Sequence, residues 1–452
     1  FDMTKENKMG TMPVPKLLIT MSLPMIISML VQALYNIVDS IFVAKLSEDA
    51  LTAVSLAFPI QNLMIAIGVG TGVGINALLS RSLGEKKFEQ ANLAAENGVF
   101  LAVISFLLTA LVGIFGSRLF FVAQTSQKTI VQYGIQYMEV ITICSIGVYI
   151  QITMERLLQA TGKTFYTMIT QGTGAIINII LDPILIFGLF GFPRLEVAGA
   201  AIATVIGQIV GAALSTFFNI RVNKEIRINM KKFRPNKQII GEIYRVGIPS
   251  IIMQSIGSVM VFGFNKILLV FNTTAAAVFG VYFKLQSFIF MPIFGINNGM
   301  VPIIAYNYGA RNRKRIMDTI RLATLISIGI MILGVLLFQF FPKTLLGFFD
   351  ASDHMISIGI PALRIISIHF VLAGYSIIIS STFQALGNGV YSLIVSVARQ
   401  LVVLLPCAWI LAECFGLNAV WFSFPAAELI SVLLCTLLFR RIDRLKLAPL
   451  EN

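Results

Sequence analysis

Apolar stretches of about 20 residues or more recur along the whole sequence and constrain the fold more than any other feature. A helix of that length crosses the hydrocarbon core of a bilayer. The stretches leave no room for a large soluble domain. They predict an all-α membrane protein with twelve transmembrane helices, whose approximate limits are 17–43, 51–79, 93–116, 131–158, 165–190, 197–220, 246–271, 275–305, 320–341, 355–384, 391–412 and 418–439.

The charged residues support this interpretation. They make up 12% of the 452 residues, about half the fraction typical of a soluble domain. The net charge of +13 could suggest a nucleic acid partner. With a cytoplasmic N-terminus, however, 25 of the 34 Lys and Arg residues fall in loops on the cytoplasmic side and only five in the opposite loops. The positive-inside rule therefore predicts a multi-pass protein of the cytoplasmic (inner) membrane with both termini in the cytoplasm, and no nucleic acid partner.

The sequence also repeats itself at one constant offset. Pro24 matches Pro249, an offset of 225 residues, and the same offset pairs Gly74 with Gly299. An even number of helices in each half makes the repeat parallel, an arrangement that in secondary transporters places the substrate path between the halves. The predicted parts are a cytoplasmic N-terminus (1–16), an N-lobe of six helices (17–221), a basic cytoplasmic linker (222–245), a C-lobe of six helices (246–440) and a cytoplasmic C-terminus (441–452).

Eight charged side chains fall inside the predicted helices. Burying an ionised group at the bilayer centre costs from about 2.5 to over 10 kcal/mol, so such residues commonly face a polar cavity and are functional. The acids favour the first half and the bases the second. They are Asp39, Glu139, Asp182, Glu428, Lys266, Lys284, Arg364 and Arg399.

Two of the acids lie on polar faces of helices that also contain a proline. The face of the first helix holds Ser28, Gln32, Tyr35 or Asn36, and Asp39, at three- to four-residue spacing. The face of the fifth holds Gln171, Gly174, Asn178 and Asp182.

Pro24 and Pro183 each remove a helix hydrogen bond and predict a bend. A low-dielectric pocket and a second carboxylate both favour the protonated form of an acid. Our hypothesis is that Asp39 and Asp182 form one proton-binding site. The alternative is that each acid only caps or pairs within its bundle.

Other features have simpler readings. The run GVGTGVG at 68–74 contains two GxxxG spacings, which predict close contact of helix backbones. The four cysteines form no CxxC pair, and we expect free, buried thiols. Lys284 and Arg399 could neutralise Glu428 or line a substrate cavity, and the sequence leaves both open.

Together, these residues resemble the multidrug and toxin extrusion (MATE) transporters over essentially the whole chain. The resemblance rests on the repeat and on the segments SLPMI (22–26), LYNIVDSIFV (34–43), LQATG (158–162), NIILDP (178–183) and VPIIAYNYGA (301–310). It implies two six-helix lobes around a central cavity and the export of amphipathic, often cationic compounds in exchange for protons or sodium ions.

Carried over by position, the family's N-lobe cation network would comprise Asp39, Asn178, Asp182 and Thr204. NorM-type relatives carry two further C-lobe acids, at positions that here are Gly257 and Tyr375. The chain therefore resembles the DinF-type or MepA-like branch, and we expect proton coupling, with Na⁺ at Asp39, Asn178 and Asp182 as the alternative. The residues expected to line the substrate cavity are Gln32, Tyr35, Asn36, Gln254, Lys284 and Arg399.

The prediction is thus a monomeric, non-enzymatic multidrug antiporter that needs no cofactor and whose partners are small amphipathic or cationic substrates and the lipid bilayer. A flippase for a lipid-linked or anionic precursor is the main alternative, supported by the basic residues of the second half. An intramembrane enzyme is a further one, but its DDxxD or GxGD motifs do not occur.

Overall fold

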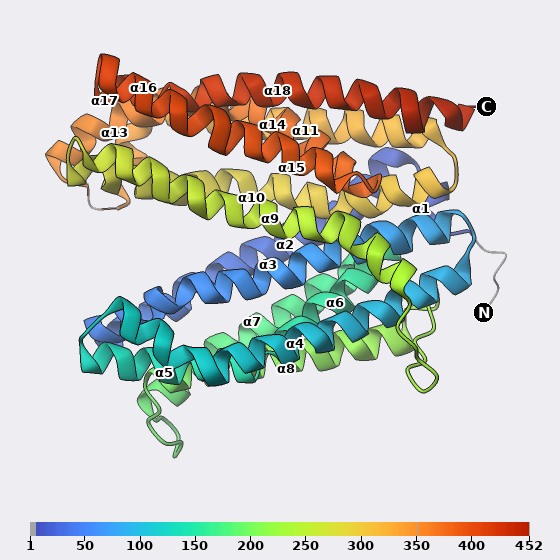
Figure 1. Cartoon of the computed structure of the whole chain (residues 1–452), viewed down its shortest axis with the longest axis horizontal. Helices are drawn as coiled ribbons and strands as arrows, with labels where there is room; N and C mark the ends of the chain where they lie inside the picture. The colour runs from blue at the N-terminus through green and yellow to red at the C-terminus, as the bar shows by residue number, and fades with distance from the viewer. Residues whose placement is uncertain (1–5, 350, 452) are drawn as a thin grey trace. The chain divides into compact units, whose positions relative to one another are not determined.

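The computed structural model describes residues 6–349 and 351–451, and all regular secondary structure in them is helical (Figure 1). Residues 1–5 of the predicted N-terminal segment lie outside the described part. Eleven helices are long and apolar enough to cross a membrane, and one further pair, bent by 45°, makes a twelfth span. The predicted all-α fold with twelve spans is confirmed.

The helices follow the two halves of the repeat. Those of the first half are α1 (Lys8–Thr11), α2 (Val14–Leu46), α3 (Glu48–Gly84), α4 (Phe88–Gln124), α5 (Lys128–Ile143), α6 (Ile146–Ala160), α7 (Thr164–Phe187) and α8 (Val197–Arg221). Those of the second half are α9 (Lys237–Leu269), α10 (Thr273–Gly309), α11 (Arg313–Phe340), α12 (Pro342–Gly347), α13 (Asp353–Ile366), η1 (Ser367–His369), α14 (Phe370–Ala385), α15 (Gly389–Val397), η2 (Ala398–Leu404), α16 (Leu405–Phe415), α17 (Leu417–Val420), α18 (Ser423–Ile442), η3 (Asp443–Leu447) and η4 (Ala448–Glu451).

The fourth predicted span, 131–158, is not one straight helix. It consists of α5 and α6, which meet at Cys144 and Ser145. Gly147 follows the break, and a Cβ there would lie 3.0 Å from the backbone nitrogen of Ile209. The bend is thus accompanied by a close approach of α6 to the backbone of α8.

The chain forms two compact units that nearly coincide with the repeats. The first unit contains Ile27–Gly247, and the second contains Lys8–Ile26 together with the residues from Ile248 onward. The first part of α2 is therefore counted in the second unit, and the first part of α9 in the first unit. The predicted limits of the lobes follow the repeat instead and stay a prediction.

In both repeats, a glycine allows close contact with the first part of α2 or α9: Gly74 of α3 contacts α9, and Gly299 of α10 contacts α2. In the first unit, a Cβ on Gly74 of α3 would collide with the backbone carbonyl of Ile243 in α9. In the second unit, a Cβ on Gly299 of α10 would lie 2.8 Å from the Cα of Ser22 in α2. The GxxxG spacing in α3 therefore marks a close backbone contact, as predicted.

Replacing Gly74 by Ala should destabilise the first unit. The new methyl group meets a backbone carbonyl, which cannot rotate away, so we expect a loss of about 1–3 kcal/mol. Thermal unfolding in detergent measures this. Gly172→Ala is the matched control, because nothing lies within 4 Å of its added Cβ and Ala favours a helix interior by up to about 1 kcal/mol. Equal unfolding temperatures for the two variants would contradict the prediction.

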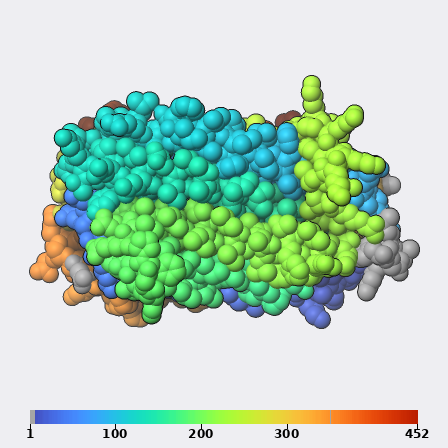
Figure 2. Space-filling model, turned by 90° about the horizontal axis from the view of Figure 1, so that it is seen from below, coloured from blue at the N-terminus to red at the C-terminus, as the bar shows by residue number. Residues whose placement is uncertain are grey.

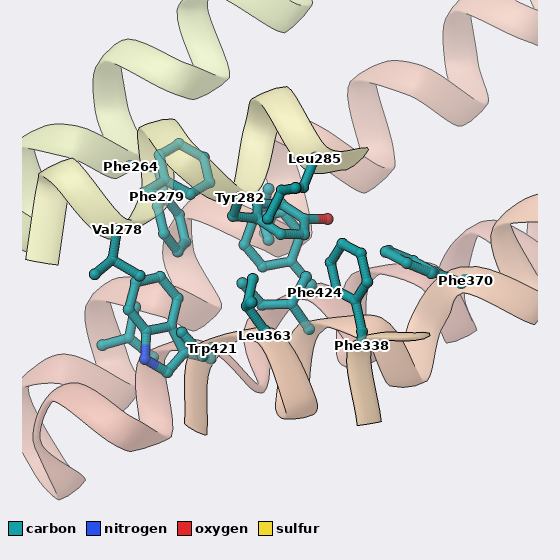
Figure 3. Close-up of a cluster of buried hydrophobic side chains, with 14 of the residues drawn as sticks. Phe264, Val278, Phe279, Tyr282, Leu285, Phe338, Leu363, Phe370, Trp421 and Phe424 are labelled. Carbon is teal, nitrogen blue, oxygen red and sulfur yellow. The ribbon is translucent and has the colours of Figure 1, made fainter. Parts of the chain in front are cut away.

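Each unit has its own interior. The first unit exposes one face through α4, α5 and α8, and the linker after α8 lies at one end of it (Figure 2). Backbone N–H groups of that linker donate to Asn92, Glu96 and Asn97 of α4. The core of the second unit is largely aromatic, and Figure 3 shows Phe264, Phe279, Trp421 and Phe424 gathered within it.

Candidate cation-binding site

Asp39 and Asp182 come together in the first unit. Asp39 lies on α2, and Asp182 lies on α7 next to Pro183. Their carboxyl groups are within hydrogen-bonding reach of each other. The Asp182 side chain is only 1% exposed, and Asp39 is half-buried, with its Oδ1 atom out of contact with solvent. The structure thus joins two acids that are 143 positions apart in the sequence.

The buried oxygens of the two carboxyl groups lack donors from the other described residues. Among the described residues, no hydrogen-bond donor reaches either oxygen of Asp182 or the buried oxygen of Asp39. Two ionised carboxylates within hydrogen-bonding reach repel each other, and a buried charge without a partner costs free energy. A proton shared between the groups, or a cation bound to them, removes both costs. The arrangement is therefore suited to binding a small cation.

Asn178 and Thr204 lie one helical turn away. Asn178 precedes Asp182 by four residues on α7, and its Nδ2 donates to the Oγ1 of Thr204 on α8 at 3.5 Å. The Oδ1 atom of Asn178 is buried without a partner. Gly174 and Gly207 allow the two helices to meet here, since a Cβ on Gly207 would lie 2.6 Å from the Gly174 carbonyl oxygen. Small residues thus bring a further unpaired oxygen close to the acids.

Tyrosines complete the surroundings of the acid pair. Tyr35 on α2 and Tyr137 on α5 are both close enough to Asp39 and Asp182 to interact electrostatically. The Oη atom of Tyr137 donates to the Oε1 of Gln61 on α3 at 3.2 Å. The sequence prediction missed Tyr137. Its signal was a polar residue on an otherwise apolar face of the fourth span, which does not distinguish it from an ordinary core tyrosine.

The other residues predicted to line the substrate cavity are mostly exposed. Gln32 and Asn36 are exposed side chains of α2, and Gln254 and Lys284 are exposed side chains of the second unit. The Lys284 ammonium lies 5.9 Å from the centre of the Phe349 ring. Their roles in a substrate cavity stay predictions. The helices α2 and α7 continue through Pro24 and Pro183, and the predicted bends stay predictions too.

Arg399 pairs with Glu428, the buried acid among the described residues of the second unit. Its Nη1 atom lies 3.7 Å from the Oε2 of Glu428, whose side chain is 3% exposed. Of the two possibilities left open by the sequence, neutralisation of Glu428 by Arg399 is the one that the contact supports. The four cysteines are free, as predicted, although Cys435 alone is fully buried and Cys414 is exposed.

The repeat places apolar residues where the second unit could have had a matching acid site. The positions 225 residues after Asp39, Asn178, Asp182 and Thr204 are Phe264, Val403, Cys407 and Leu429. Phe264 is fully buried, and its ring centre lies 4.6 Å from that of Phe279 and 5.1 Å from that of Phe424. Aromatic packing thus stands in the second unit where the first unit has its carboxyl pair.

Metals that need several charged or sulfur ligands do not fit the cluster. Among the described residues, no three His, Cys, Asp or Glu side chains gather to hold a metal ion. The carboxyl oxygens of Asp39 and Asp182 and the amide oxygen of Asn178 would suit a hard monovalent ion. These oxygens would suit a proton and Na⁺ equally.

Known proteins match the chain over nearly all of its length. The MatE family model matches residues 24–184 and 249–410, one match in each repeat. The multidrug export protein MepA of Staphylococcus haemolyticus is 28% identical over 421 residues, which cover 93% of this chain and 92% of that protein. MepA of Staphylococcus aureus is 28% identical over 429 residues, covering 94% and 93%.

Solved structures agree with the sequence relatives. An outward-facing multidrug resistance MATE family transporter of the MOP superfamily superposes with a TM-score of 0.91, 25% identity and 99% coverage of both chains. A MOP superfamily transporter from Pyrococcus furiosus superposes with a TM-score of 0.90, 26% identity and 98% coverage of both. The chain is thus a multi-pass membrane protein that belongs to the MatE family of transporters.

Proposed function

We propose that this transporter exports amphipathic, often cationic organic compounds in exchange for protons that bind at Asp39 and Asp182. The observation that carries the proposal is the carboxyl pair of Asp39 and Asp182, whose three buried oxygens have no donor among the described residues. The names of the relatives, multidrug export proteins and a multidrug resistance transporter, support the substrate class. Neither transport nor its coupling requires a cofactor or an enzymatic step.

The coupling follows from competition for charge. When the pair is deprotonated, its negative charge favours a positively charged substrate, and when it is protonated that attraction is lost. Proton binding therefore weakens substrate binding, and by linkage substrate binding weakens proton binding to the same extent. Protons taken up on the outside would release the substrate there. Alternation between outward and inward states, which the parallel repeat favours, would return the protonated, substrate-free site to the inside, where the protons leave.

Substrate-driven proton movement in proteoliposomes tests the proposal. We expect ethidium to drive proton flux through the reconstituted protein, and the flux to persist when choline replaces sodium. If the flux requires sodium, the coupling ion is Na⁺, bound by the same oxygens, and not the proton. Movement of lipid between leaflets without ethidium-driven flux would support the flippase alternative, although Arg399, one of the bases that favoured it, is paired with Glu428.

A further inference from the structure

The first unit contains a second buried acid, on α6, and α6 packs against α7, the helix that carries Asp182. Glu155 of α6 is 3% exposed, although its position next to Arg156 near a loop is typical of a solvated helix end. It packs against α7, where Gln171 lies eleven positions before Asp182. At 1.5 Å per residue the two centres are about 16 Å apart along α7. The first unit therefore holds two carboxyl centres at different depths.

The partners of Glu155 are the unusual feature. Its Oε1 accepts from Thr170 Oγ1 at 2.7 Å and from Gln151 Nε2 at 3.0 Å, and its Oε2 accepts from Gln171 Nε2 at 2.9 Å. A hydroxyl can donate or accept, and a glutamine amide can present either its nitrogen or its oxygen. All three partners can therefore satisfy a carboxylate and, after turning, a protonated carboxyl group as well.

The nearest cation, Arg156, interacts electrostatically with Glu155 but forms no ion pair with it. Arg156 directs its Nη1 to the Oε1 of Gln159 at 3.1 Å, and no ion pair of the described residues includes Glu155. Glu428 is the contrast, because Arg399 holds it in an ion pair. A carboxyl group whose hydrogen-bond partners can all reverse their roles is equipped to change charge without a change of fold.

Several other charged groups lie on the helices and loops around α6. Lys163 lies in the loop between α6 and α7, where burial lowers its pKa and the nearby Glu225 partly offsets this. Arg81 of α3 pairs with Glu85 and Glu242. The remaining ionisable groups on the helices packed against α6 are Glu48, Asp49, Glu89, Glu96, Arg118, Tyr166, Asp182 and Arg221.

We infer that Glu155 is a second proton-binding site, which takes up and releases its own proton in each transport cycle. It lies five residues before the end of α6, about 8 Å along the helix, at the end that the positive-inside rule assigns to the cytoplasm. The inference rests on the proposed proton coupling. Together the acid pair and Glu155 would carry two protons in for each substrate carried out.

Charge movement tests this inference. With two protons exchanged for one ethidium cation, each cycle moves about one net charge, so export responds to membrane potential. Glu155→Gln should leave one proton per ethidium, so that export becomes electroneutral and insensitive to a potassium–valinomycin potential. The slope of log transport against pH, in the range where proton binding limits the rate, should fall from about two to about one.

Two further variants separate a proton site from a structural role. Glu155→Asp keeps a titratable group and should retain the response to potential, whereas Glu139→Gln, an acid of α5 outside both sites, should not alter it. If Glu155→Gln keeps both the response and the slope while Asp39→Asn abolishes proton flux, the inference is wrong and the proposed function stands. If Asp39→Asn also keeps the flux, the proposed function itself fails.

Infrared spectroscopy covers the case in which Glu155→Gln does not fold. Thr170→Val removes one partner of Glu155 but keeps the acid. Acidification of the wild-type protein should produce a protonated-carboxyl band that shifts in this variant and persists in Asp39→Asn. Absence of a band that responds to Thr170→Val would overturn the inference.

Discussion

Replacing Asp39 by Asn is expected to abolish the accumulation of substrate against a gradient. Asparagine keeps the shape of the side chain but cannot exchange a proton, and it leaves Asp182 without its carboxyl partner. At about 100 mV and a pH difference of about one unit, one proton supplies roughly 3.7 kcal/mol, enough for a gradient of about 400-fold in a neutral substrate. The variant should reach no more than equilibrium.

Uptake into inside-out vesicles with an imposed proton gradient measures this effect. Ser40→Ala is a suitable control, because Ser40 is the exposed neighbour of Asp39 on α2. Binding of ethidium to the purified protein separates coupling from folding, since Asp39→Asn should still bind substrate but with a weaker pH dependence than the wild type. Proton-driven accumulation at the wild-type level would refute the assignment of Asp39.

Truncating Trp421 to Ala should destabilise the second unit more than any other substitution considered. Its indole is fully buried, and its ring centre lies 6.0 Å from that of Phe264. Removing a large buried aromatic side chain costs about 3–5 kcal/mol, from lost contacts and from the cavity that remains.

The protein carries its own control for this experiment. Trp409, the other tryptophan, is 58% exposed, and Trp409→Ala should change thermal unfolding in detergent only slightly. Because both variants replace a tryptophan by alanine, the difference between their unfolding temperatures measures the effect of burial alone. Similar unfolding temperatures would show that the aromatic cluster around Phe264 does not stabilise the second unit as its packing implies.

The fold was predictable because its signals are local and repeated. Apolar length gives the spans, and the constant offset that pairs Pro24 with Pro249 gives the two halves. The break at Cys144 and Ser145 was not predictable, because neither residue forbids a helix. The bend accompanies the close contact between Gly147 and Ile209, which only the packed structure contains.

The candidate site was predictable in part for a similar reason. Asp39 and Asp182 stand out as acids within apolar helices, and Asn178 shares a helix face with Asp182. Glu155 escaped notice because it adjoins Arg156 near a loop, a pattern typical of a solvated helix end. Its three partners come from two helices, and Thr170 and Gln171 can donate to it only when α7 packs against α6.

The apolar replacement of the acid site in the second half has a consequence for how such a chain can evolve. A tandem of two first halves would inherit two carboxyl pairs, whereas a tandem of two second halves would inherit Phe264 and Cys407 twice and no carboxyl pair. After duplication, only one copy had to keep the ability to titrate. The other copy could replace its acids by apolar residues such as Phe264, so neither half can now substitute for the other.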